Sequence, residues 1–171
     1  MATTMRLIAK TVLGSDTATI TFDNIPGTYT DLLLNGSART AATGTVVRAF
    51  QLKLNSSTSN FSSRNLYGDG SGVGSGTDYL SGRGLCYATG ASATANTFAS
   101  FEVYFPNYAG STNKSYSAAS VTENNATEAH QILIAGLWSN TAAITRIDLD
   151  AYLGPNFVSG SSFYLYGITK A

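Results

Sequence analysis

The chain has 171 residues, a length typical of one domain with a single core, and 12% of its residues are charged, about half of the usual share of roughly 25%. Ten basic residues balance ten acidic ones, and no Lys/Arg cluster is present that would attract phosphate backbones, so nucleic acid is not an expected partner. A net charge near zero also removes the repulsion between copies and favours association.

Residues 1–15 carry a charge every few positions and no apolar run of the length that a signal peptide or a membrane helix requires. We therefore expect a soluble protein, made in the cytoplasm, with no membrane partner. Period-two alternation of apolar and polar residues then recurs along the chain, whereas sustained helical spacing is not found. In residues 17–22, for example, Ala18, Ile20 and Phe22 are expected to share one buried face.

The alternation predicts about ten strands. In chain order they are residues 5–12, 17–22, 29–38, 46–54, 82–90, 98–105, 114–122, 131–139, 143–152 and 161–170. Strands at this spacing without intervening helices are typical of an all-β, antiparallel sandwich or barrel, so we expect a single β-sandwich domain over residues 1–171.

The three prolines, Pro26, Pro106 and Pro155, are followed by Gly27, Asn107 and Asn156. Proline presets φ for the second position of a β-turn, and Gly or Asn accepts a positive φ at the third. Each proline is therefore predicted to lie in a turn that ends a strand.

Residues 66–80, "LYGDGSGVGSGTDYL", place glycine at every second position from Gly68 to Gly76. The spacing does not fit a phosphate-binding G-x-G-x-x-G motif. Gly74 to Leu80, with Asp78, resembles one calcium-binding nonapeptide repeat, but that architecture needs several stacked copies and the chain has one. We expect a long loop without regular structure, because alternate glycines maximise backbone entropy; whether Gly68 to Asp78 is ordered or binds calcium stays open.

Asp148 and Asp150 lie about 7 Å apart on one face of a predicted strand, beside Arg146. Paired carboxylates can serve glycoside hydrolysis or hold calcium. We favour a solvated strand face on which Arg146 relieves the repulsion, with Ile147 and Leu149 pointing into the core.

Cys86 is the only cysteine and His130 the only histidine, which excludes an internal disulfide, a CxxC zinc site and a multi-histidine metal centre. Cys86 lies in an apolar strand pattern, where an inert buried thiol is expected rather than half of a Cys-His dyad. His130 is expected at the end of a polar loop. We assign no catalytic, cofactor-binding or metal-binding residues and expect no cofactor and no enzymatic activity.

Four further segments are distinctive: "TFDNIPGTYTDLLLNGSAR" (21–39), "RNLYGDGS" (64–71), "GLWSNTAAITRIDL" (136–149) and "FVSGSSFYLYGI" (157–168). Together they resemble the β-sandwich virion proteins of tailed bacteriophages. The resemblance implies a jelly-roll fold, a place on the capsid surface, on tails or on fibres, and no catalytic residues.

The function expected from this resemblance is that of a capsid decoration (cement) protein. Such a protein binds the major capsid protein and copies of itself, as a homo-oligomer such as a trimer, on the outer surface of the virion head. The alternative is a tail or fibre component that binds host-surface carbohydrate through exposed tyrosines and loop carboxylates. A glycan-degrading enzyme would rest on Asp148 and Asp150 alone.

Overall fold

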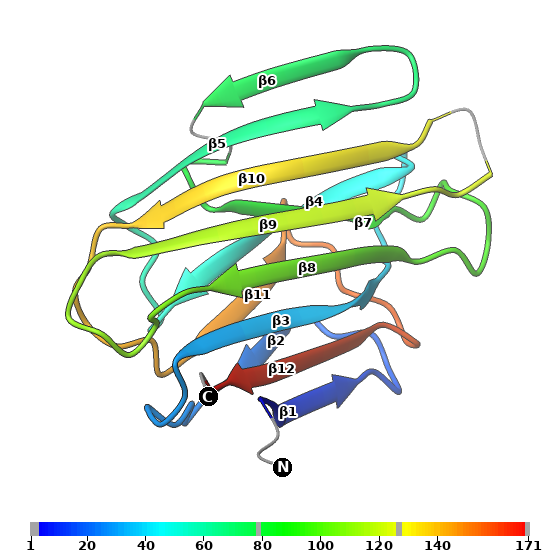
Figure 1. Cartoon of the computed structure of the whole chain (residues 1–171). Helices are drawn as coiled ribbons and strands as arrows, with labels where there is room; N and C mark the ends of the chain where they lie inside the picture. Colours follow the sequence, from blue (N-terminus) through cyan, green and yellow to red (C-terminus); the bar gives the residue numbers. More distant parts are fainter. Residues whose placement is uncertain (1–3, 78–79, 126–127, 170–171) are drawn as a thin grey trace.

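The computed structural model describes residues 4–77, 80–125 and 128–169. Within these ranges the chain forms twelve strands, which confirms the all-β prediction (Figure 1). None of these residues belongs to a helix long and apolar enough to span a bilayer. The strands are β1 (Met5–Val12), β2 (Thr19–Phe22), β3 (Asp31–Ala38), β4 (Val47–Leu54), β5 (Phe61–Gly68), β6 (Val73–Thr77), β7 (Gly84–Thr89), β8 (Ala99–Phe105), β9 (Lys114–Thr122), β10 (His130–Trp138), β11 (Ile147–Ala151) and β12 (Ser162–Ile168).

The strands form two antiparallel sheets that pack face to face. The large sheet has the order β1-β12-β3-β8-β9-β10-β5-β6, and the small sheet has the order β2-β11-β4-β7. Figure 1 shows the large sheet in front and the small sheet behind it. The predicted antiparallel β-sandwich is therefore confirmed.

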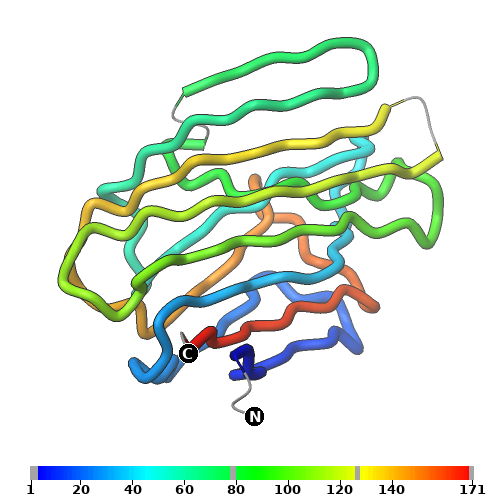
Figure 2. The backbone as a smooth tube through the Cα atoms, in the orientation of Figure 1, coloured from blue at the N-terminus to red at the C-terminus, as the bar shows by residue number. Residues whose placement is uncertain are grey.

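Eight of these strands have the pairing order of a jelly roll. The outermost strands of the chain, β1 and β12, pair in the large sheet, and the next pair inward, β2 and β11, pair in the small sheet. The remaining four strands extend the large sheet beyond β8. The hairpin of β5 and β6 forms one margin of this extension, and β1 forms the opposite margin of the sheet (Figure 2).

The core lies between the two sheets and is built from the inward side of each alternating strand. Phe50 of β4 packs edge-on against Phe101 of β8 and against Phe157, with ring centroids 5.1 and 5.8 Å apart. Phe163 of β12 completes the cluster, 5.2 Å from Phe157. Beneath the extension, the fully buried Trp138 stacks on Phe61 at 6.1 Å.

Several observed strands differ from the predicted bounds by a few residues, and two of these differences are instructive. Ala18 is exposed and precedes β2, whereas Ile20 and Phe22 are buried as predicted. The strand predicted at 143–152 begins only at Ile147, because the Asn55 side chain binds the preceding backbone in place of a neighbouring strand. Its Oδ1 accepts hydrogen bonds from the N–H groups of residues 145 and 146 at 2.9 and 3.1 Å, and its Nδ2 donates to the carbonyl of residue 143.

The prediction of a long irregular loop at Gly68–Gly76 is wrong. The chain instead turns at residues 69–72 and returns as β6, in continuous antiparallel register with β5. Glycine is compatible with this strand because two β5 side chains lie over it. A Cβ on Gly74 would lie 2.7 Å from the Tyr67 ring, and one on Gly76 would lie 2.8 Å from Asn65 Oδ1.

The turn prediction holds in full at one of the three prolines. Asn107, after Pro106, has a positive φ of 48°. Gly27 and Asn156 are not among the residues with positive φ. Near Pro155 the chain reverses just before the proline, at Leu153 and Gly154. None of the three prolines lies within a strand, as predicted.

Candidate interaction surface

The outer face of the large sheet, opposite the core, carries a regular array of side chains. The strand registers align outward-facing residues in rows across the sheet. From β8 to β6, three neighbouring rows are Ser100, Val121, Gln131, Gly68 and Val73; Glu102, Ala119, Leu133, Leu66 and Ser75; and Tyr104, Ser117, Ala135, Arg64 and Thr77.

Four large apolar side chains of these rows stand exposed near one another, and we call them the apolar patch. They are Leu66, Val73, Val121 and Leu133, with exposed fractions of 55%, 89%, 45% and 47%. Single exposed apolar residues are ordinary, but a group of them on one sheet face is typical of a contact surface.

Small residues beside the apolar patch leave an open hollow of about 550 Å³ in the outer face. The residues that line it include the small Ser117, Ala119 and Ala135 and the larger Leu66 and Leu133. Arg64 and Glu102, which also line it, supply a charge of each sign. A second open hollow, beside Leu66, Val73 and Leu133, continues the surface to the β6 margin. The shape and chemistry suit a protruding apolar side chain of a partner protein, ringed by polar groups.

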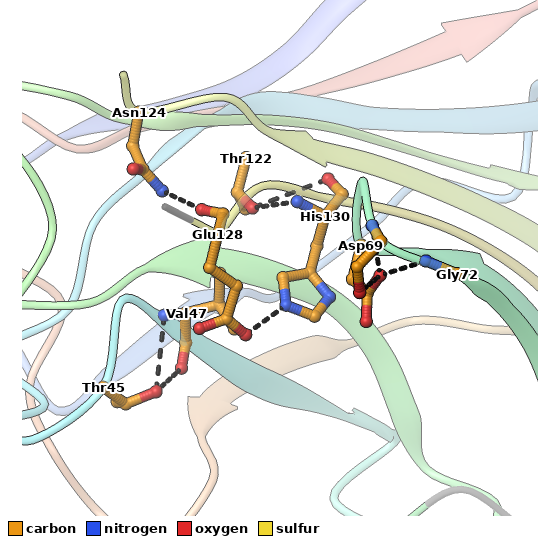
Figure 3. Close-up of polar contacts among 9 residues, drawn as sticks. Thr45, Val47, Asp69, Gly72, Thr122, Asn124, Glu128 and His130 are labelled. Atoms are coloured by element: carbon orange, nitrogen blue, oxygen red, sulfur yellow. Dashed lines mark hydrogen bonds and ion pairs between the residues drawn. The ribbon is translucent and has the colours of Figure 1, made fainter. Parts of the chain in front are cut away.

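The turn between β5 and β6 is fixed by one carboxylate (Figure 3). Asp69 Oδ1 accepts hydrogen bonds from the backbone N–H of Ser71 at 2.9 Å and of Gly72 at 2.8 Å, and from the Ser71 hydroxyl. These hydrogen bonds, the Ser71 hydroxyl first, lower the pKa of Asp69 to about 2. Gly70 takes the positive φ of 86° that the turn requires.

His130, the first residue of β10, follows the polar connection from β9, as predicted. Its Nε2 lies 2.5 Å from Glu128 Oε1, and its backbone N–H donates to the hydroxyl of Thr122 (Figure 3). The imidazole also meets the Tyr87 ring edge-on at 5.2 Å.

Cys86 is fully buried in β7, and burial raises the pKa of its thiol well above the usual value. Its Sγ contacts the carbonyl of Ala119 at 3.6 Å. The prediction of an inert buried thiol agrees with this environment, because the reactive thiolate is disfavoured there.

Asp148 and Asp150 lie on the outer face of the small sheet, each bound to a cation. Arg146 donates to both carboxylate oxygens of Asp148 from Nε and Nη2 at 2.8–3.1 Å, and Thr21 donates to it at 2.7 Å. Lys53 lies 2.5 Å from Asp150. The predicted orientation is correct, since Ile147 and Leu149 face the core, but Asp148 itself is 3% exposed and not solvated.

Burial alone would raise the pKa of Asp148. The hydrogen bonds from Arg146 and Thr21 outweigh it, so that the pKa lies below the usual value. The carboxylate is therefore charged at neutral pH and saturated with donors, an arrangement that stabilises the join between β2 and β11.

The described residues contain no group of three His, Cys, Asp or Glu side chains placed to hold a metal ion. Of the calcium-like segment Gly74 to Leu80, Asp78 lies outside the described residues. No sequence signal pointed to the apolar patch, because its members come from three separate stretches of the chain and only the register of the strands unites them.

No protein-family model, no curated protein and no solved structure matches the chain.

Proposed function

We propose that the chain is a structural protein of a tailed-phage virion: a capsid decoration (cement) protein that binds the outer surface of the head lattice and stabilises it. The observation that carries the proposal is the apolar patch and its hollow, on a sheet face supported from below by the core. The four segments that resemble phage virion proteins supply the biological setting. In this proposal the major capsid protein and further copies of the chain are the partners.

The proposed mechanism is mass action. A protein that binds the assembled lattice but not its dissociated subunits shifts the equilibrium towards assembly, by about 2.7 kcal/mol per site when its free concentration is 100 times Kd. The large sheet suits this task because its face is already ordered before binding, so little entropy is lost on association.

The contact can be tested at Leu133, which lies in the apolar patch and borders the hollow. About half of this side chain is exposed, so burying the rest is worth about 1 kcal/mol, or roughly a fivefold change in Kd. Leu133→Lys also places a charge in the interface, and we expect affinity for heads that lack the protein to fall at least tenfold.

Leu153→Lys is the matched control. Leu153 is 75% exposed in the connection after β11, outside the apolar patch. We expect the Leu153→Lys protein to bind heads with the same affinity as the unmodified protein. It should also raise the temperature at which the heads fall apart by the same amount. Equal binding by the Leu133→Lys protein would contradict the proposed contact face.

The alternative, a tail or fibre component that binds carbohydrate, has one supporting feature. Tyr164 and Tyr166 of β12 and Tyr104 of β8 lie half-buried on the outer face, with Asn35 and Glu102 nearby in the same rows. Tyrosine rings beside amide and carboxylate groups are suited to sugar stacking and hydrogen bonding. If the protein binds host-surface glycans and Tyr164→Ala abolishes that binding, this alternative is favoured. If the protein binds heads and added glycan does not change its affinity for them, decoration is favoured.

A further inference from the structure

The free margin of the large sheet at β6 is unprotected. Among the described residues β6 pairs only with β5, so its second row of backbone N–H and C=O groups faces outward. Natural proteins usually protect such an edge with charges, proline or bulges, because it otherwise pairs with another strand. The residues of β6, Val73–Thr77, include none of these, and the β5–β6 register has no shift.

The opposite margin, β1, has the protection that β6 lacks. It carries Arg6 and Lys10, and its register shifts between Leu7 and Ala9. One margin of the same sheet is therefore protected against pairing and the other is left open.

The sequence of β6 is nearly symmetric about its centre. It reads V-G-S-G-T, with β-branched residues at both ends, a glycine on each side, and Ser75 in the middle. In an antiparallel pair of two such strands centred on Ser75, Val73 of each copy would lie opposite Thr77 of the other, and Gly74 opposite Gly76. β-branched pairs of this kind stabilise sheets, and the glycines leave space for Tyr67 and Asn65 of both copies on the inner face.

The charges of the chain are also compatible with a second copy pairing at this edge. The chain has no net charge, and β6 itself carries no charged side chain. No charge repulsion therefore opposes the approach of two identical β6 edges.

We propose that β6 pairs with β6 of a second copy about a two-fold axis at Ser75, which joins two large sheets into one. Each copy contributes the same strand to this contact, so both β6 edges are used up once two copies have paired, and the assembly stops at a dimer. It also joins the two apolar patches across one continuous outer face. The inference does not rest on the proposed function, because it concerns the purified protein alone.

Ser75 is exposed, so its replacement leaves the core untouched. We expect the parent chain to sediment at twice its mass of 17.9 kDa and Ser75→Lys, which opposes two ammonium groups at the axis, to sediment as a monomer. Ser115→Lys, at an exposed site on β9, is the matched control and should remain a dimer. A monomeric parent chain at all concentrations, or a dimeric Ser75→Lys protein, would overturn the proposal.

A cross-linking experiment tests the register. Opposed residues of an antiparallel pair have Cβ atoms about 4.5–5.5 Å apart, near the span of a disulfide. Mild oxidation should therefore link Ser75→Cys into a covalent dimer rapidly and leave Ser115→Cys uncoupled. Failure of Ser75→Cys to couple faster than Ser115→Cys would refute pairing centred on Ser75. If the parent chain is monomeric and Ser75→Lys abolishes binding to heads, the edge instead takes a segment of the lattice protein and the dimer proposal is wrong.

Discussion

Asp148 provides a direct test of whether the conspicuous carboxylates of β11 are structural. The variant Asp148→Asn removes the negative charge while keeping the size of a side chain that is 3% exposed. It weakens the contacts from Arg146 and Thr21, of which the shortest are 2.8 and 2.7 Å. Hydrogen bonds to a charged group are worth about 1.5–3 kcal/mol each, but the Arg146 side chain is 40% exposed, so screening reduces its share.

We therefore expect Asp148→Asn to lower the free energy of unfolding by about 2 kcal/mol at pH 7, and Tm by about 4–8 °C for a chain of this length. The effect should depend on pH. Because the pKa of Asp148 is lowered in the folded state, its stabilising contribution is complete above the unfolded pKa of roughly 3.9 and is lost as the pH falls through the folded pKa.

The assay is urea unfolding of both proteins at pH 7 and at successively lower pH, followed by the fluorescence of the buried Trp138. The difference between the two proteins should be largest at neutral pH and should shrink on acidification below pH 4. Equal stability at pH 7, or a difference that does not change with pH, would refute the assignment of Asp148 as a charged structural group.

Three further predictions concern packing, the hairpin and the thiol. Gly136→Ala should lower the free energy of unfolding by about 1–3 kcal/mol, because the new Cβ would lie 2.0 Å from the Tyr116 ring, whereas Gly14→Ala, which meets open space, should unfold at an unchanged urea midpoint. Asp69→Ala should speed hydrogen exchange at the backbone amides of β6 without changing exchange in β9, since it removes three hydrogen bonds from the turn; unchanged β6 exchange would contradict the role of the carboxylate. Cys86 should react with an aromatic disulfide reagent only after unfolding, and rapid labelling of the native protein would show that the thiol is not held in the core.

The sequence predicts best those strands in which apolar and polar residues alternate, because the alternation shows that one face of the strand is buried. β8 is the clearest case: Phe101, Val103 and Phe105 are buried and alternate with exposed or half-buried polar residues, and the predicted bounds differ from the observed ones by one residue. β5 and β6 were missed for a physical reason. They lie at the margin of the large sheet, and the inward positions of β6 are Gly74 and Gly76, whose space is filled by Tyr67 and Asn65 of the neighbouring strand. A glycine that makes room for another strand's side chain has no signature in its own stretch of sequence.

The apolar patch could not be predicted for a related reason. Leu66 lies in a stretch far from Val121 and Leu133, which belong to the consecutive strands β9 and β10, and each of the three is an ordinary exposed residue by itself. Their proximity follows from the order β9-β10-β5 and from registers in which Leu66 lies opposite Leu133. Local alternation determines which face a residue occupies, but only strand pairing determines its neighbours on that face.

The most direct test of a capsid decoration role is the number of copies per virion, measured by quantitative mass spectrometry against the major capsid protein. We expect a fixed ratio close to the number of equivalent sites on the head lattice, and loss of the protein from virions when Leu133 is replaced by Lys. A handful of copies per particle, found with the tail fraction, would contradict that role.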